Sequence, residues 1–248
     1  MKRISQRVLL LAGLSLALWC LGAGADDTPT QPFITSADKI SAGDTAWMLS
    51  STALVLLMTI PGLALFYAGM VRQKNVLSTA LQSFAVCCLV TVLWVVIGYS
   101  LAFTPGTAFI GGFSRVLLGG MSYVKSTGML SVSHIAPTIP ESVFVMFQMT
   151  FAIITPALIA GAFAERMKFS AMLWFIGIWA IAVYAPVAHW VWGPDGFLSN
   201  GNSDALIKVL DFAGGTVVHI NAGIAGLVCA YCLASVRTPA PATTWFSP

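Results

Sequence analysis

The chain has 248 residues, of which 58% are hydrophobic and 8% are charged, and its mean hydropathy is +0.87. Soluble globular proteins carry charges at about a quarter of their positions, so this composition excludes that class and indicates a membrane protein with several spans. The net charge of +3 is too small to suggest a nucleic-acid partner. With no nucleophile–base pattern and no phosphate-binding loop, we expect neither an enzyme nor a cofactor.

Residues 1–25 have the three parts of a secretory signal peptide. Basic residues stand at positions 2, 3 and 7, an apolar stretch covers 8–21, and Ala23-Gly24-Ala25 is a small-residue cleavage pattern. An uncleaved first helix is the alternative. In either case we expect residues 26–46 to be a periplasmic amino-terminal segment.

Hydropathy predicts an all-α membrane protein with a transmembrane domain over 47–236 and a disordered tail over 237–248. We expect five transmembrane helices at about 47–71, 76–103, 142–164, 169–192 and 211–236. Two connections are tight turns (72–75 and 165–168), whereas 104–141 and 193–210 are long. Arg72, Lys74, Arg166 and Lys168 lie in the tight turns, and Arg237 follows the fifth span. Basic residues in short loops face the cytoplasm, so we expect the mature amino terminus outside a plasma (inner) membrane.

Several local features carry simpler expectations. We expect a short surface helix over Phe113–Met121 and a solvated loop histidine at His134. Pro61 and Pro156 should bend the first and third spans. The Cys229-x-x-Cys232 pair has the spacing of a redox or metal motif, but its place in an apolar span favours small apolar filler.

The fifth span holds two ionisable residues, Asp211 and His219. Eight helical residues rise about 12 Å, which places Asp211 at the outer mouth and His219 near mid-membrane. Asp is a favoured N-cap, so a structural role is the first interpretation of Asp211. Gly215, His219 and Gly223 share one stripe and predict close approach of another helix. In an apolar wall His219 should be neutral, with one donor and one acceptor nitrogen, as a packing group or a pore-lining group.

Aromatic residues near the outer mouth form a candidate cation site. Phe147 and Phe151 are four apart on one face of the third span, and Trp192 ends the fourth. Aromatic faces attract small cations, although Phe pairs at this spacing are usually packing and Trp favours membrane interfaces. We interpret His189 as a packing or capping histidine.

Four segments together resemble the ammonium transporter family (Amt/Rh, bacterial Amt branch). They are PGLALFYAGMVRQKNVLS (61–78), FQMTFAIITPALIAGAFAERMKFSA (147–171), AHWVWGPDGFL (188–198) and DFAGGTVVHINAGIAGLV (211–228). The resemblance covers about residues 44–236. It implies a homotrimer with one pore per subunit, and a possible cytoplasmic P-II signal protein as partner.

The resemblance also implies roles for individual residues. Phe151 and Trp192 would line the outer ammonium site, with Phe147 beside them, and Phe151 would also form an aromatic gate. Asp211 would order this site, and His219 would be the first of two pore histidines. Ammonium would lose its proton outside the apolar section, and ammonia would cross past the histidines.

The family fold has eleven helices, built as two inverted five-helix repeats and a final helix, and this sequence resembles the first repeat, the amino-terminal half. The segment RTPAPATTWFSP (237–248) does not resemble the family's continuation, so we expect a truncated or frame-shifted product. The second pore histidine, a gate phenylalanine and a recognition-site serine would come from the other half. We therefore expect ammonium transport as the family function, with a non-conducting subunit, an ammonium-sensing partner of full-length trimers or an inactive fragment as alternatives.

Overall fold

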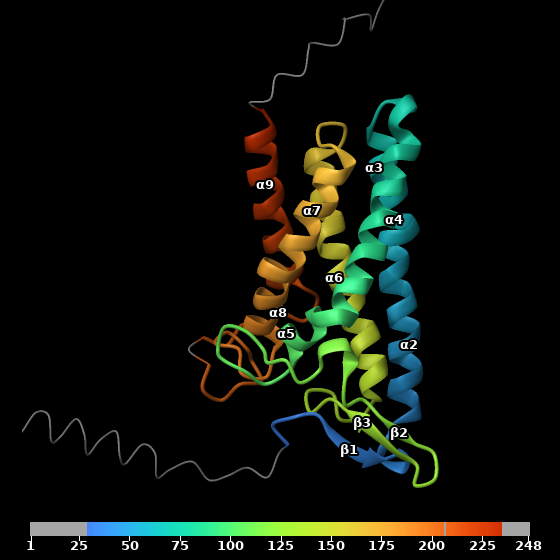
Figure 1. The fold of residues 1–248 in the computed structure, drawn as a ribbon, viewed down its shortest axis with the longest axis vertical. Helices are drawn as coiled ribbons and strands as arrows, with labels where there is room; N and C mark the ends of the chain where they lie inside the picture. Colours follow the sequence, from blue (N-terminus) through green and yellow to red (C-terminus); the bar gives the residue numbers. More distant parts are fainter. Residues whose placement is uncertain (1–28, 206, 235–248) are drawn as a thin grey trace, which may run out of the picture.

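The structure is a computed structural model that describes residues 29–205 and 207–234 (Figure 1). The predicted signal peptide (1–25) and tail (237–248) lie outside the described residues. Five helices in the described part are long and apolar enough to cross a membrane. They cover Ala42–Met70, Gln73–Phe103, Glu141–Phe163, Phe169–Trp192 and Gly215–Ala234. The five predicted spans are thus confirmed, with some ends shifted.

The first span is interrupted near its middle. It consists of α2 (Ala42–Leu57), the π-helical segment η2 (Met58–Leu63) and α3 (Ala64–Met70). Ile60 leaves the helical region with φ −128° and ψ 108°, because a residue before proline is pushed out of the α conformation and Pro61 has no N–H. The predicted bend at Pro61 is confirmed. The span begins at Ala42 rather than at Trp47, since Ser41 caps it by accepting from the Asp44 N–H at 3.1 Å.

The other spans contain fewer or milder interruptions. The second comprises η3 (Gln73–Asn75), α4 (Val76–Leu93), η4 (Trp94–Gly98) and α5 (Tyr99–Phe103). The third is α6 (Glu141–Phe163), which continues as one α-helix through Pro156. The fourth comprises α7 (Phe169–Trp179), η6 (Ala180–Tyr184) and α8 (Ala185–Trp192), and the fifth η7 (Gly215–Ile220) and α9 (Asn221–Ala234).

Helix α6 is the centre of the bundle. Of its apolar stretch 72% is buried, against 17–39% in the other spans. Helices α2, α4 and α9 all pack against it (Figure 1). The remaining spans therefore present much of their apolar surface outward, as expected where the surroundings are hydrocarbon rather than water.

The two ends of the bundle differ. We call the end with the turns 72–75 and 165–168 the turn end, and the opposite end, with the long connections, the loop end (Figure 1). The loop end carries a small antiparallel sheet, which the all-α prediction omitted: β1 (Phe33–Ser36), β2 (Tyr123–Val124) and β3 (Met129–Val132), in the order β1-β3-β2. Phe33 pairs with Val132, and Tyr123 with Leu130. The 3-10 turn η1 (Ala37–Lys39) follows β1.

The predicted surface helix over Phe113–Met121 is wrong. This segment contains only the short 3-10 turn η5 (Val116–Leu118). Leu117 has a φ of 54°, in the left-handed region, which prevents an α-helix from continuing. The preceding Arg115 is held from both sides, since its N–H donates to Ser100 Oγ at 3.0 Å and its Nη1 donates to the Gly119 carbonyl at 3.2 Å.

A buried ion pair attaches this connection to the helices. Glu141, at the start of α6, is fully buried. Its carboxylate accepts from Arg115 Nε at 2.8 Å and Nη2 at 3.2 Å, and from the Tyr99 hydroxyl at 3.1 Å. A buried carboxylate with this many donors is tolerated, whereas an unpaired one is strongly unfavourable.

A second carboxylate joins the two tight turns at the turn end. Glu165 Oε1 accepts from the Arg72 N–H at 3.2 Å, from Arg72 Nε at 3.3 Å, and from Asn75 Nδ2. We call this contact the Glu165 clasp. The hydrogen bond from Asn75, together with the donors and charge of Arg72, lowers the pKa of Glu165 below its ordinary value, against a smaller opposing effect of burial.

We expect loss of Arg115 to destabilise the fold more than loss of the whole pair. Arg115→Met leaves the Glu141 carboxylate buried without its ion-pair partner, which costs about 3–5 kcal/mol. The double variant Arg115→Met/Glu141→Gln removes that charge and should recover most of the thermal midpoint in detergent. If the decreases in thermal midpoint caused by the two single substitutions simply add in the double variant, the ion pair does not attach the Arg115 connection to α6.

We expect the Glu165 clasp to weaken in acid. Because its folded-state pKa lies below the ordinary value of about 4.3, its stabilisation is complete above that value and is lost as the pH falls through the lower, folded-state pKa. The thermal midpoint of the unaltered chain should therefore fall more steeply below about pH 4.3 than that of Glu165→Gln. Asp38→Asn, in an exposed carboxylate of η1, is the control. Equal acid sensitivity of the unaltered chain and Glu165→Gln would contradict the assignment.

Candidate functional site

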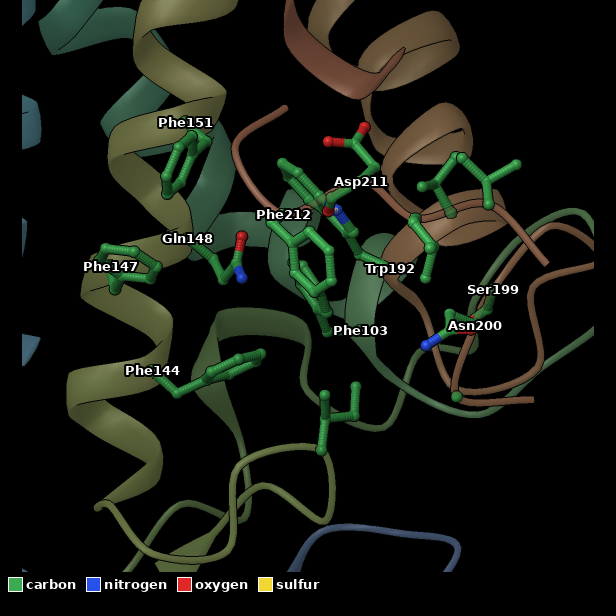
Figure 2. Close-up of a pocket in the computed structure, with 15 residues that line it drawn as sticks. Phe103, Phe144, Phe147, Gln148, Phe151, Trp192, Ser199, Asn200, Asp211 and Phe212 are labelled. Carbon is green, nitrogen blue, oxygen red and sulfur yellow. Dashed lines mark hydrogen bonds between the residues drawn. The ribbon is translucent and has the colours of Figure 1, made fainter. Parts of the chain in front are cut away.

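A cavity of about 300 Å³ opens at the loop end between α6, α8 and the connection that precedes η7 (Figure 2). The residues predicted to form the outer site all line it: Phe147, Phe151, Trp192 and Asp211. The remaining lining residues are Phe103, Ile135, Phe144, Gln148, Val191, Ser199, Asn200, Gly201, Val209, Leu210 and Phe212. The lining side chains therefore come from the second, third and fourth spans and from the connections between spans, including the one before the fifth span.

Three aromatic rings form one wall of this cavity. Phe147 and Phe151 lie one turn apart on α6, with centroids 5.0 Å apart and an interplanar angle of 79°. Phe151 meets Trp192 at 5.7 Å and 71°. Both are edge-to-face contacts, a favoured arrangement of aromatic pairs. Trp192 Nε1 donates to the Asp211 carbonyl at 2.7 Å, which fixes the indole at the end of α8.

The Asp211 carboxylate caps the fifth span. Its Oδ1 accepts from the N–H groups of Gly214 at 2.6 Å and Gly215 at 2.8 Å, and its Oδ2 from those of Thr216 at 2.8 Å and Val217 at 3.0 Å. All four donors are main-chain groups that a helix start leaves without an internal partner. The predicted capping role of this side chain is thus observed.

The fifth span begins at Gly215 and not, as predicted, at Asp211. The reason lies at Gly214, whose φ of 84° is left-handed and cannot belong to a helix. A Cβ on Gly214 would also lie 2.5 Å from Val218 Cγ2, so the position has no room for a side chain. This turn lets Asp211 reach back over the helix start from outside it.

His219 lies on an open face of the bundle and does not line the cavity. Its Nδ1 is 3.0 Å from the Gly214 carbonyl. Since a carbonyl can only accept, Nδ1 carries a proton. The donor nitrogen of the predicted pair is thus identified, while Nε2 as an acceptor stays a prediction.

The predicted close helix contact at the glycine stripe does not form within the described residues. A Cβ on Gly215 or Gly223 would meet no atom within 4 Å. The fifth span instead packs on α6 through Gly226, where a Cβ would lie 3.5 Å from Ala162 Cβ. The stripe that includes His219 is thus left open.

The other two histidines have structural surroundings. His189 is fully buried, with Nδ1 3.0 Å from the Ala102 carbonyl and Nε2 2.8 Å from the Thr107 carbonyl, so the predicted packing role is confirmed. His134 is not a solvated loop residue as predicted. Both of its ring nitrogens are buried and have no hydrogen-bond partner among the described residues. Burial lowers the pKa of His134, against the opposing charges of Asp195 and Glu141.

Sequence reasoning missed Gln148, which lies beside Phe147 and points toward the cavity (Figure 2). Its Oε1 is buried and has no hydrogen-bond partner among the described residues. A glutamine in an apolar span is costly and usually functional, and this signal was available from the sequence. Over the described residues, no group of three or more His, Cys, Asp and Glu side chains could hold a metal ion.

Comparisons with known proteins agree on one family. A sequence model of the Ammonium Transporter Family matches residues 46–240. The chain is 52% identical to an ammonium transporter of Bacillus subtilis over 191 residues, which are 77% of this chain and 44% of that protein. It is 50% identical to an ammonium transporter of Aquifex aeolicus over 201 residues, 80% of this chain and 44% of that protein.

Solved structures give the same result. Saccharomyces cerevisiae Mep2 matches with a TM-score of 0.66 and 32% identity, over 79% of this chain and 42% of that chain. Candida albicans Mep2 matches with a TM-score of 0.63 and 32% identity, over 77% and 39%. The chain thus spans less than half the length of the relatives it matches. It belongs to the ammonium transporter family.

Proposed function

We propose that this chain acts in ammonium transport, as a subunit or part of a subunit that recognises ammonium at the loop end and forms one wall of a path for ammonia. The observation that carries the proposal is the cavity itself. Three aromatic rings and an amide oxygen, which has no hydrogen-bond partner in the described part of the chain, line one space of about 300 Å³.

The cavity has what a small N–H cation needs. The faces of Phe147, Phe151 and Trp192 would attract the charge, each by about 0.5–2 kcal/mol depending on desolvation. The Gln148 Oε1 would accept one N–H. Asp211 would act differently, because its carboxylate is already bound to four main-chain N–H groups. It holds Trp192 in place and adds a favourable negative potential without touching the ion.

His219 would serve the next step. An isolated ion in an apolar path costs many kcal/mol, so ammonium must leave its proton behind, which potassium cannot do. Phe151, at the inner side of the aromatic wall, would act as a gate. A neutral imidazole with an acceptor Nε2 can then pass hydrogen bonds to ammonia along a narrow path.

The open face around His219 supports a pore shared with a second helical unit. His219 is exposed, and Gly215 and Gly223 would accommodate a close neighbour. By analogy with the family we propose a homotrimer in the plasma (inner) membrane with its mature amino terminus outside. A P-II signal protein would then meet the basic turn end.

A non-conducting subunit or ammonium-sensing partner of full-length trimers is the second candidate. The same exposure of His219 favours it, because a wall without its opposite wall conducts nothing. The two candidates predict the same ammonium site and differ in transport.

We expect the chain to restore growth on low ammonium, in a bacterial strain without its own transporters, only beside a polypeptide that supplies the second five-helix unit. His219→Ala should abolish that restored growth, while His134→Ala, outside the proposed path, should retain it. Methylammonium uptake into the same cells provides the direct measurement. Restored growth by the chain in isolation would contradict the shared-pore proposal, and no restoration with the second unit would favour the non-conducting alternative.

We expect Asp211→Asn to loosen the start of the fifth span and impair uptake. An amide replaces one acceptor oxygen by a donor that faces the N–H groups of Thr216 and Val217, which costs about 1–3 kcal/mol. Hydrogen exchange at residues 214–217 should accelerate about tenfold or more. Asp204→Asn, at an exposed carboxylate of the loop end, is the matched control. Unchanged exchange in Asp211→Asn would rule out the capping account of this residue.

A further inference from the structure

A second hollow lies far from the ammonium cavity, on the outward side of the bundle between α4 and α7. It has a volume of about 450 Å³ and an almost entirely apolar lining. Leu89 and Leu93 of α4 form one side, Trp174 and Ile178 of α7 the other, and Ser170 lies toward the turn end. We call this hollow the α4/α7 groove. Trp174 is 75% exposed, so no part of the described chain covers this side.

Gly177 keeps the groove open. A Cβ at this position would lie 3.7 Å from Leu93 Cδ1 and 3.8 Å from Leu89 Cδ2, which is ordinary van der Waals contact. An alanine would therefore fit, whereas a longer side chain would occupy the hollow between the two helices. The groove therefore depends on this position carrying no side chain longer than a methyl group.

The length of the groove matches one leaflet of a bilayer. Its lining runs along the fourth span from Ser170 to Ile181, a rise of about 16 Å at 1.5 Å per residue. Half of a hydrocarbon core is about 15 Å. An extended acyl chain that enters at the turn end would thus lie in the groove over most of its length.

The turn end of the groove is positively charged. Helices α4 and α7 both begin there, so the positive ends of both helix dipoles point the same way. Lys74 precedes α4 and Lys168 precedes α7. Both lysines are exposed, and neither makes an ion pair within the described residues.

The Glu165 clasp brings these charges together. It binds the turn before α4 to the turn before α7 through Arg72 and Asn75. The same contacts occupy the one carboxylate of the two turns, which leaves Lys74, Arg166 and Lys168 as uncompensated charges. The groove lining ends at Ser170, two residues after Lys168. An apolar slot that points toward basic turns fits a lipid with a negative headgroup.

We propose that the α4/α7 groove binds an anionic phospholipid, with one acyl chain along Gly177 and the phosphate against Lys74 and Lys168. The inference requires only that the chain spans a bilayer, and it is independent of ammonium transport. Each lysine near the membrane surface is expected to favour an anionic over a zwitterionic headgroup by about fivefold.

Quenching of Trp174 fluorescence by brominated lipids tests the proposal with the full chain in vesicles. Brominated phosphatidylglycerol in a phosphatidylcholine membrane is compared with brominated phosphatidylcholine at the same mole fraction. The difference between the unaltered chain and Trp174→Phe isolates the Trp174 signal. Trp47, which is 70% exposed on α2, provides the reference signal in the same way through Trp47→Phe.

We expect the anionic quencher to be enriched at Trp174 by about fivefold per lysine and not to be enriched at Trp47. Lys74→Gln/Lys168→Gln should remove the enrichment, while Lys39→Gln/Lys125→Gln at the loop end should leave it. Gly177→Leu should abolish it, and Gly177→Ala should retain it. Circular dichroism confirms that each variant is folded, and the lysine pair still tests the proposal if Gly177→Leu is not.

Four outcomes would overturn the proposal. Equal quenching by both lipids at Trp174 means annular lipid only. Enrichment that survives Gly177→Leu means a charged surface without an acyl-chain groove. Loss with Gly177→Leu but not with the lysine pair means an apolar groove without headgroup recognition. Absence of quenching at Trp174, with normal quenching at Trp47, means that another protein surface covers the groove.

Discussion

The site depends on how the fifth span begins. A helix that starts where the hydrocarbon begins must find partners for its first N–H groups, because hydrocarbon offers none. Here one carboxylate, from Asp211, accepts four of them. The left-handed turn at Gly214 makes this reach possible. An acidic side chain in this position is therefore first a structural requirement, and its charge is an additional consequence.

The same turn links the two proposed functional groups. On one side, the Asp211 carbonyl accepts from Trp192 Nε1 and fixes the aromatic wall of the cavity. On the other side, the Gly214 carbonyl accepts from His219 Nδ1 and fixes the tautomer of the imidazole. The proposed cation site and the proposed path for ammonia need opposite environments, one polarised and one dry. The four-residue turn from Asp211 to Gly214 lies between the groups proposed for each.

Hydropathy, basic turns and prolines predicted the five spans of this fold. The features that they missed arise from local geometry. Long apolar stretches, short basic turns and Pro61 each have one dominant structural effect. The five spans and the break in the first span could therefore be predicted. The sheet strands are at most four residues long, which is too short for an alternating pattern to mark them. In addition, β1 pairs with β3 across about a hundred positions, although only a short turn separates β2 from β3. The left-handed backbone of Leu117 and the burial of the His134 ring nitrogens are properties of the folded connections, and no local sequence pattern marks them.

For the candidate site, residue type singled out the ionisable groups, and their roles stay predictions. Asp211 and His219 stand out because ionisable groups are rare in or beside apolar spans. The same argument applies to Gln148, although a neutral amide is a weaker signal than a charge. The aromatic residues stand out less, and the structure shows that three of them line one cavity. The α4/α7 groove could not be predicted, since it depends on a small residue at Gly177 between two otherwise ordinary apolar faces.

Two open surfaces of this bundle therefore call for different neighbours. The face around His219 carries a polar imidazole, and a polar group turned toward hydrocarbon is unfavourable unless protein or water satisfies it. That face is stable only beside another helical surface or a narrow polar path. The lining of the α4/α7 groove is almost entirely apolar, so a lipid chain can fill it, and basic turns lie at the end where headgroups lie. The distribution of polar atoms thus assigns protein to one face and lipid to the other.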